Sequence, residues 1–96
     1  MTSAADIRKT LRKHKPLLRK KFKVRKIGIF GSYVRGEQSK KSDVDILVDF
    51  SEPIGWEIVD LKELLEDALG LKVDLVVARA LKPRLAAGIL KEVVYA

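Results

Sequence analysis

Apolar residues recur at helical spacing in the first part of this sequence. Between Ala4 and Phe22 they return every three or four positions, which predicts an amphipathic helix. Pro16 has no backbone N–H to donate inside a helix, so we expect a break near Lys15 and a second short helix that opens at Pro16. The stretch from Val24 to Phe30, basic at its entry and apolar at its end, then predicts a first strand.

A short polar stretch separates this strand from a second one. Ser32 to Arg35 is predicted to form one turn of helix, followed by a loop to Ser42. From Asp43 to Phe50, β-branched and aromatic residues occupy every second position, and three aspartates and Leu47 occupy the positions between them. Because successive side chains of a strand leave opposite faces, one face should pack while the acidic face borders a cleft.

The remaining pattern predicts helix, strand and helix. Trp56 to Leu69 has helical spacing and ends at Gly70. Leu71 to Val77 is mainly apolar, with Lys72 near its start and Asp74 inside it, and predicts a third strand. Leu81 to Tyr95 is expected to form a last helix whose buried stripe comprises Leu85, Ile89 and Val93. Helices and strands in this order predict an α/β fold, with a small mixed β-sheet flanked by helices.

Composition narrows the class of protein. Ninety-six residues, 47% hydrophobic and 34% charged, suit a single globular domain spanning residues 1–96. We expect a cytoplasmic protein with no membrane partner, because no apolar run resembles a membrane span or a signal peptide. Without cysteine, and with His14 as the only histidine, a metal ion would have to be bound by oxygen ligands.

The net charge of +7 comes from the N-terminal region. Residues 1–26 contain eleven Lys or Arg and one acidic residue, which suits either a solvated helix face or contact with a polyanion or an acidic partner. A nucleic-acid-binding module would rest on this charge alone, and we do not expect a nucleic acid partner. Tyr33, Trp56 and Tyr95 are expected to pack; exposure of any of them would favour a dimer or a partner contact.

The candidate chemistry lies between Ile29 and Phe50. Gly31 permits a tight turn and Ser32 suits a helix start, so this pair could form a phosphate-binding site. Asp43 and Asp45 are two residues apart on a predicted strand and could hold one hard cation between them. Each pair also has a purely structural interpretation. Gly31 and Ser32 could be a common turn with a helix cap, and Asp43 and Asp45 could lie on a solvated strand face.

A third carboxylate, Asp74, could join this pair if the two strands that carry them are neighbours. Repulsion among three carboxylates would then oppose their ionisation unless a cation were bound. Mg²⁺ suits this oxygen set together with substrate phosphates, and two such ions can promote an in-line displacement. Asp74 could instead bond to backbone groups in a turn, and Arg35 could be a surface charge or the ion-pair partner of an acid.

Together these residues form a pattern that resembles a known family. Phe30-Gly31-Ser32, Arg35-Gly36, Ser42-Asp43-Val44-Asp45-Ile46 and Val73-Asp74-Leu75 resemble the minimal nucleotidyltransferase family, a small branch of the DNA polymerase β-like superfamily. The resemblance covers nearly the whole chain. It implies a nucleotidyltransferase fold like the polymerase β palm, and an enzyme of that class.

The resemblance also implies roles for individual residues. Gly31 and Ser32 match residues that hold the triphosphate of a bound NTP, and we place Arg35 and Ser42 with them as nucleotide-binding. Phosphate contact and structural pairing both stay open for Arg35. Asp43, Asp45 and Asp74 match the catalytic, metal-binding carboxylates, with Asp74 helping to deprotonate an acceptor hydroxyl. The implied cofactor is a pair of Mg²⁺ ions.

The same resemblance bears on partners. Similar proteins pair with a small helical HEPN-domain toxin as its antitoxin, in some cases by transferring AMP to a tyrosine. It therefore implies a Mg²⁺-dependent transfer of NMP, with ATP as the expected donor, to a hydroxyl of a HEPN partner. A non-catalytic binding antitoxin or a nucleotide-sensing subunit is the alternative, and a homo-oligomer stays open.

Overall fold

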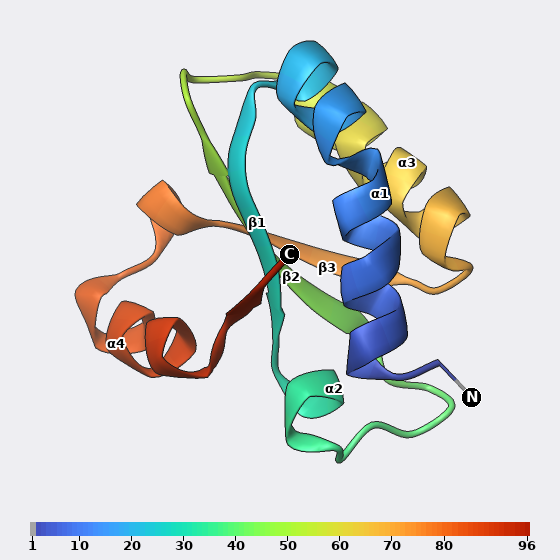
Figure 1. The fold of residues 1–96 in the computed structure, drawn as a ribbon. Helices are drawn as coiled ribbons and strands as arrows, with labels where there is room; N and C mark the ends of the chain where they lie inside the picture. Colours follow the sequence, from blue (N-terminus) through green and yellow to red (C-terminus); the bar gives the residue numbers. More distant parts are fainter. Residues whose placement is uncertain (1) are drawn as a thin grey trace.

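The structure, a computed structural model, describes residues 2–96 and places one sheet between helices (Figure 1). The strands of this sheet are β1 (Val24–Phe30), β2 (Val44–Phe50), β3 (Val73–Val77) and β4 (Val94–Tyr95). The helices are α1 (Ala4–Phe22), α2 (Ser32–Arg35), α3 (Glu57–Leu69) and α4 (Pro83–Glu92), with a short 3₁₀ helix η1 (Ala78–Ala80) after β3.

The strand order confirms the predicted small mixed sheet. The strands lie in the order β3-β2-β1-β4, with β1 antiparallel to both β2 and β4, and β2 parallel to β3. The bounds predicted for β1 and α2 are those observed. The strand predicted from Asp43 begins at Val44, and the strand predicted from Leu71 begins at Val73. This topology makes the two strands that carry the candidate carboxylates neighbours.

Helix α1 is continuous, so the predicted break at Pro16 is wrong. Ser3 and Asp6 start the helix with a reciprocal capping box, in which each side chain accepts from the other's backbone N–H at 3.2 Å. Pro16 lies on the exposed face of the helix. The carbonyl left without a helical donor is that of the exposed Arg12, which water can reach, and the buried face holds the helix together.

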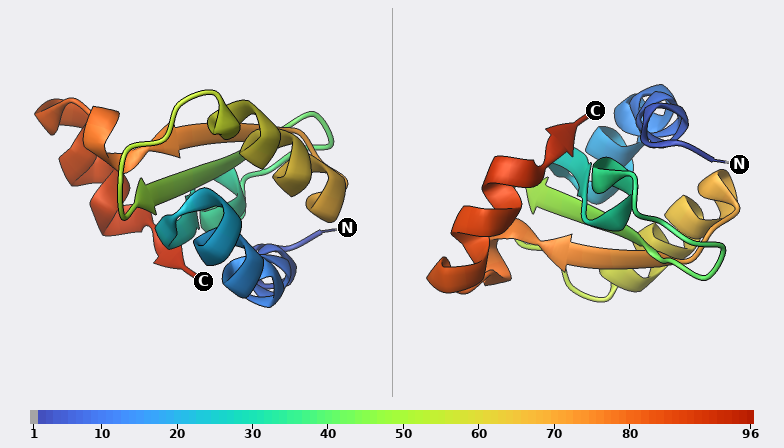
Figure 2. Two further views of the ribbon diagram at one scale, coloured as in Figure 1. Left: turned by 90° about the horizontal axis from the view of Figure 1, so that it is seen from above. Right: turned by 90° about the horizontal axis from the view of Figure 1, so that it is seen from below.

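The core lies between the sheet and the pair formed by α1 and α3. These two helices contact each other and the sheet, on the side opposite α4, and both views of Figure 2 keep α4 apart from them. Among residues 2–96, no helix has the length and apolar character needed to cross a membrane. The fully buried side chains include Ile7, Leu11, Leu18, Ile27, Ile29, Val44, Ile46, Val48, Leu61 and Leu65.

The last predicted helix ends earlier than expected. Helix α4 stops at Glu92, and Val94 and Tyr95 pair with β1 as strand β4 instead of continuing the helix to Tyr95. Gly28 allows this close approach, because a Cβ there would lie 2.9 Å from the Val94 carbonyl oxygen. Consecutive valines suit a strand better than a helix, so long-range pairing with β1 overrides the helical pattern.

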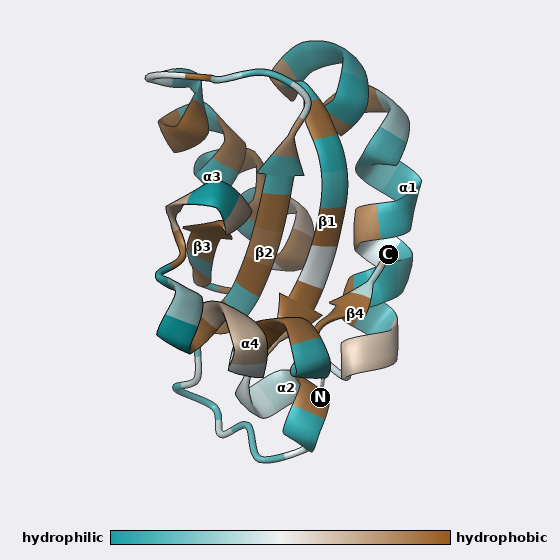
Figure 3. Ribbon diagram, turned by 90° about the vertical axis from the view of Figure 1, so that its left-hand side faces the viewer, coloured by the Kyte–Doolittle hydropathy of each residue, from teal (hydrophilic) through white to brown (hydrophobic). Residues whose placement is uncertain are grey.

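The predicted buried stripe of α4 is also wrong. No residue of this helix is buried, and Leu85 and Leu90 are 59% and 53% exposed. Figure 3 shows α4 in front of β1 and β2, on the side of the sheet away from α1. Among residues 2–96, nothing covers the outer face of α4 in the way that α1 and α3 cover the opposite face of the sheet.

The three aromatic residues expected to pack have different surroundings. Tyr33 is buried as predicted, whereas Tyr95 is 40% exposed and Trp56 is 90% exposed. Trp56 is the turn residue directly before α3, and its exposure shows that its side chain does not pack against the core. The predictions that Trp56 and Tyr95 pack are therefore wrong, and both are exposed groups of the kind that contacts partners.

Candidate active site

The candidate site begins at Gly31, where β1 ends and α2 begins. Gly31 has φ 80° and ψ −153°, a backbone region that is essentially restricted to glycine. A Cβ at this position would lie 2.0 Å from Asp45 Oδ2. Glycine is required here for two reasons, because it forms the turn and lets the Asp45 carboxylate lie against that turn.

The carboxylates of β2 and β3 lie side by side. Asp45 is paired with Asp74 in the parallel register, and Asp43 immediately precedes β2. Burial raises the pKa of the half-buried Asp45 carboxyl, and the nearby Asp74 and Asp43 carboxylates raise it further. Asp74 is exposed on the edge strand, so it carries none of the burial cost of an acid inside a core strand. The structure thus brings the three predicted aspartates together.

These carboxylates have the chemistry of a divalent-cation site without forming a closed cage. Among residues 2–96, no set of three His, Asp or Glu side chains is arranged to hold a metal ion by itself. Mg²⁺ commonly uses one or two carboxylates and completes its coordination with water and substrate phosphate oxygens. Asp45 and its neighbours therefore fit Mg²⁺ in donor type, since their mutual repulsion is what a cation relieves.

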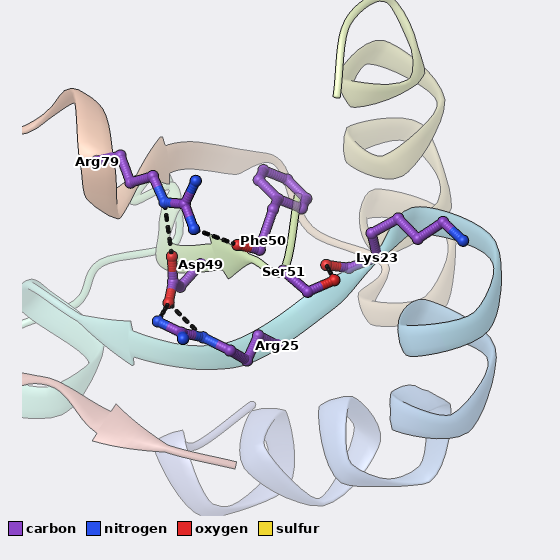
Figure 4. A network of polar contacts seen from close by, with 6 residues as sticks. All are labelled: Lys23, Arg25, Asp49, Phe50, Ser51 and Arg79. Atoms are coloured by element: carbon purple, nitrogen blue, oxygen red, sulfur yellow. Dashed lines mark hydrogen bonds and ion pairs between the residues drawn. The ribbon is translucent and has the colours of Figure 1, made fainter. Parts of the chain in front are cut away.

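Asp49, the other acid on this face of β2, has a different environment. Figure 4 shows its carboxylate between Arg25, whose Nε donates at 2.9 Å, and Arg79, whose Nε lies 3.7 Å away. Arg79 also donates to the backbone carbonyl of Phe50 at 3.1 Å. Asp49 is thus neutralised by arginines. Among residues 2–96, no ion pair neutralises Asp43, Asp45 or Asp74 in this way.

Ser42 shapes the loop that leads to Asp43. Its Oγ accepts from the backbone N–H of Ser39 at 2.9 Å, and its own N–H donates to the Ser39 carbonyl at 3.1 Å. The predicted nucleotide-binding serine therefore closes a turn in this structure. Beside it lies a cavity of about 450 Å³, lined by Lys40, Lys41, Ser42, Asp43, Gly70, Leu71 and Lys72. Its lysines would attract an anion next to Asp43.

Arg35 forms ion pairs with two acids. Its Nε lies 3.0 Å from Glu37 Oε1, and its Nη1 lies 2.6 Å from Glu92 Oε1. Glu92 also accepts from the backbone N–H of Gly31 at 2.9 Å. Structural pairing of Arg35 is thus observed, while a phosphate contact stays a prediction.

Glu92 was not predicted as a site residue. It is one acid on a helix more than fifty residues from the Gly-Ser turn, and no local motif in the sequence connects the two. The contact depends on the pairing of β4 with β1, which brings the end of α4 next to Gly31.

Comparison with known proteins identifies the class that this fold and these residues define. The sequence model of the family described as the nucleotidyltransferase domain matches residues 11–96. The chain belongs to that family, whose members are nucleotidyltransferase enzymes. It is also 52% identical over 96 residues to the protein adenylyltransferase MntA of Thermococcus cleftensis, covering 99% of this chain and 97% of the relative.

Solved structures agree with this placement. A chain described provisionally as a minimal nucleotidyltransferase superposes with a TM-score of 0.82 at 33% identity, covering 97% of this chain and 95% of that one. The structure of a toxin-antitoxin with AMP-PNP matches with a TM-score of 0.70 at 29% identity, covering 98% and 72%. A chain from the structure of a tri-AMPylated Shewanella oneidensis HEPN toxin in complex with MNT antitoxin matches with a TM-score of 0.66 at 26% identity. The match covers 93% of this chain and 70% of that one. The resemblance to minimal nucleotidyltransferases is therefore confirmed.

Proposed function

We propose that this protein transfers AMP from ATP to a hydroxyl group of a HEPN-domain partner and so acts as its antitoxin. The observation that carries the proposal is the grouping of Asp45 and Asp74 beside the Gly31 turn, with Asp43 next to them. The named adenylyltransferase relative and the AMPylated toxin complex support the choice of AMP and of the partner.

The donor nucleotide would lie along the turn between β1 and α2. Ser32 and Arg35 would contact the triphosphate, with Gly31 shaping the turn and Ser42 holding the adjacent loop. Asp43, Asp45 and Asp74 would hold Mg²⁺, which supplies charge neutralisation for the phosphate oxygens when bound. The donor side of the site is thus contained in this chain.

The chemistry then needs one acceptor and one base. The acceptor oxygen attacks the α-phosphorus of ATP, the bond from that phosphorus to the bridging oxygen breaks, and pyrophosphate leaves. The hydroxyl proton passes to the Asp74 carboxylate, which is exposed at the edge strand and can be reached from outside. An exposed base at a sheet edge suits an acceptor presented by another protein.

The test is transfer of label to a HEPN-domain protein of the same genome. With Mg²⁺ present, ATP labelled in the α-phosphate should label the partner, whereas ATP labelled in the γ-phosphate should not. Asp43→Asn and Asp45→Asn should abolish labelling. Asp49→Asn is the matched control, because Asp49 lies on the same strand but is held by arginines. Absence of labelling, or labelling that survives Asp45→Asn, would reject the proposal.

A binding antitoxin without catalysis is the second candidate function. The observation that favours it is the exposed apolar surface of α4, where Leu85 and Leu90 could contact a partner. This candidate predicts that Leu85→Ser with Leu90→Ser abolishes neutralisation of the toxin and that Asp45→Asn preserves it. The catalytic proposal predicts loss of neutralisation by Asp45→Asn while the complex still forms.

A further inference from the structure

Glu92 connects the end of α4 to the turn at which the donor site begins. One carboxylate oxygen accepts from the Gly31 backbone N–H at 2.9 Å, and the other pairs with Arg35 Nη1 at 2.6 Å. The Glu92 side chain is only 24% exposed, whereas Leu85 and Leu90 of the same helix are more than half exposed. Both oxygens therefore contact groups of the proposed phosphate-binding segment.

This contact restrains the Arg35 side chain without using up its donors. Glu37 holds Nε and Glu92 holds Nη1, so the guanidinium is restrained from two directions. Among residues 2–96, no protein acceptor binds Nη2, and the Arg35 side chain is 49% exposed. The guanidinium thus keeps a free edge to bind an anion, and a restrained arginine loses less conformational entropy on binding than a free one.

The position of Glu92 is itself fixed by its neighbours. Strand β4 follows within two residues and pairs with β1 at Gly28 and Ile29, close to the end of β1, which Gly31 follows. The chain end is held further by Arg8 and Lys15, which donate to the Tyr95 and Ala96 carbonyls. Sheet pairing therefore places the Glu92 carboxylate next to the turn.

We propose that Glu92 is a positioning residue for the nucleotide. It holds the Gly31–Ser32 turn and the Arg35 guanidinium in the arrangement that receives the triphosphate. This inference rests on the proposed function, because it assigns Glu92 a role in ATP binding. The alternative is that the Glu92 carboxylate competes with phosphate for the Gly31 N–H and for Arg35. In that case Glu92 would weaken ATP binding, and removing its carboxylate would make ATP bind more tightly.

Titration calorimetry of the full chain with ATP and Mg²⁺ tests the assignment. Glu92→Gln keeps the size of the side chain and removes the charge that pairs with Arg35, so it should weaken ATP binding roughly tenfold. Glu37→Gln is the comparison variant, because it removes the other ion pair of Arg35 and leaves the contact between Glu92 and Gly31 intact; it should weaken ATP binding less than Glu92→Gln does. An equal or larger loss for Glu37→Gln would contradict the particular role of Glu92. Equal or tighter binding by Glu92→Gln would overturn the assignment.

Two further variants separate positioning from charge and from general instability. Glu92→Asp keeps the charge but is too short to reach both Gly31 and Arg35, so it should also weaken ATP binding; unchanged binding would contradict positioning. In an Arg35→Ala background, Glu92→Gln should add less than its own single effect, because the two residues act together. Independent effects would contradict a role through Arg35.

The result for the wild-type chain distinguishes the two proposals. If the wild-type protein does not bind ATP, the proposed function fails and Glu92 has no nucleotide to position. If it binds ATP and Glu92→Gln binds equally well, only the role of Glu92 fails. Melting temperatures, measured alongside, show that each variant is folded at the temperature of the titration.

Discussion

Replacing Gly31 by alanine tests how closely the turn and the Asp45 carboxylate are packed. The new Cβ would lie 2.0 Å from Asp45 Oδ2 and 2.9 Å from its Cγ. The backbone region of Gly31 costs a non-glycine residue about 1–3 kcal/mol. Displacing the carboxylate adds about 1–3 kcal/mol, as in other overpacked sites. We expect Gly31→Ala to lower the free energy of unfolding by roughly 2–6 kcal/mol.

Gly36→Ala is the matched control. Gly36 also has a positive φ, 72°, but a Cβ there would meet nothing within 4 Å. Only the left-handed backbone should then be penalised, by about 1–2 kcal/mol. Urea denaturation followed by circular dichroism gives both values.

A double variant isolates the contact with Asp45. In an Asp45→Ala background the two nearest atoms to the new Cβ are gone and only the residue 45 Cβ, at 3.3 Å, remains. Gly31→Ala should then cost about as much as its backbone strain alone. If Gly31→Ala costs the same in both backgrounds, or no more than Gly36→Ala, the close packing described here is refuted.

Two further predictions concern charge and helix geometry. Burial and nearby carboxylates raise the folded-state pKa of Asp45 above its unfolded value, so the folded chain binds more protons between the two values, and stability should fall as pH rises through that window. In metal-free buffer, Asp45→Asn should therefore have a higher free energy of unfolding than the wild type at neutral pH, and this free energy should no longer fall with pH in that window. Urea titrations measure both values, and a variant less stable than the wild type at neutral pH would contradict the prediction. Pro16→Ala should restore a donor to the Arg12 carbonyl and stabilise the chain by roughly 1–3 kcal/mol. Lys20→Ala, on the same exposed face, is its control in thermal denaturation, and equal melting temperatures for both variants would count against the explanation.

Local rules predicted much of this fold. The bounds of β1 and α2 follow from a stretch that becomes apolar toward Phe30 and from the glycines, Gly31 and Gly36, on either side of a four-residue segment. The alternation along β2 placed Asp45 on the face opposite Ile46 and Val48, both of which are buried. These features depend on residues close together in sequence, so the sequence pattern was sufficient to predict them.

The features that the sequence did not reveal depend on distant contacts. Helix α1 passes through Pro16 because its buried face packs on the sheet and α3, which the local rule for proline ignores. Residues 94–95 form a strand only because β1 offers them a free edge. The same pairing brings Glu92 to Gly31, so the contact could not be found without the sheet order.

The measurement that tests the central claim most directly is the stoichiometry of the products. The chain, ATP, Mg²⁺ and a HEPN-domain partner are incubated together, and intact-mass spectrometry of the partner is combined with assays for pyrophosphate and ADP. Our account predicts one pyrophosphate released for each AMP attached to the partner, with no ADP, and neither product with Asp45→Asn. An unmodified partner, or ADP formed together with a phosphorylated partner, would contradict it.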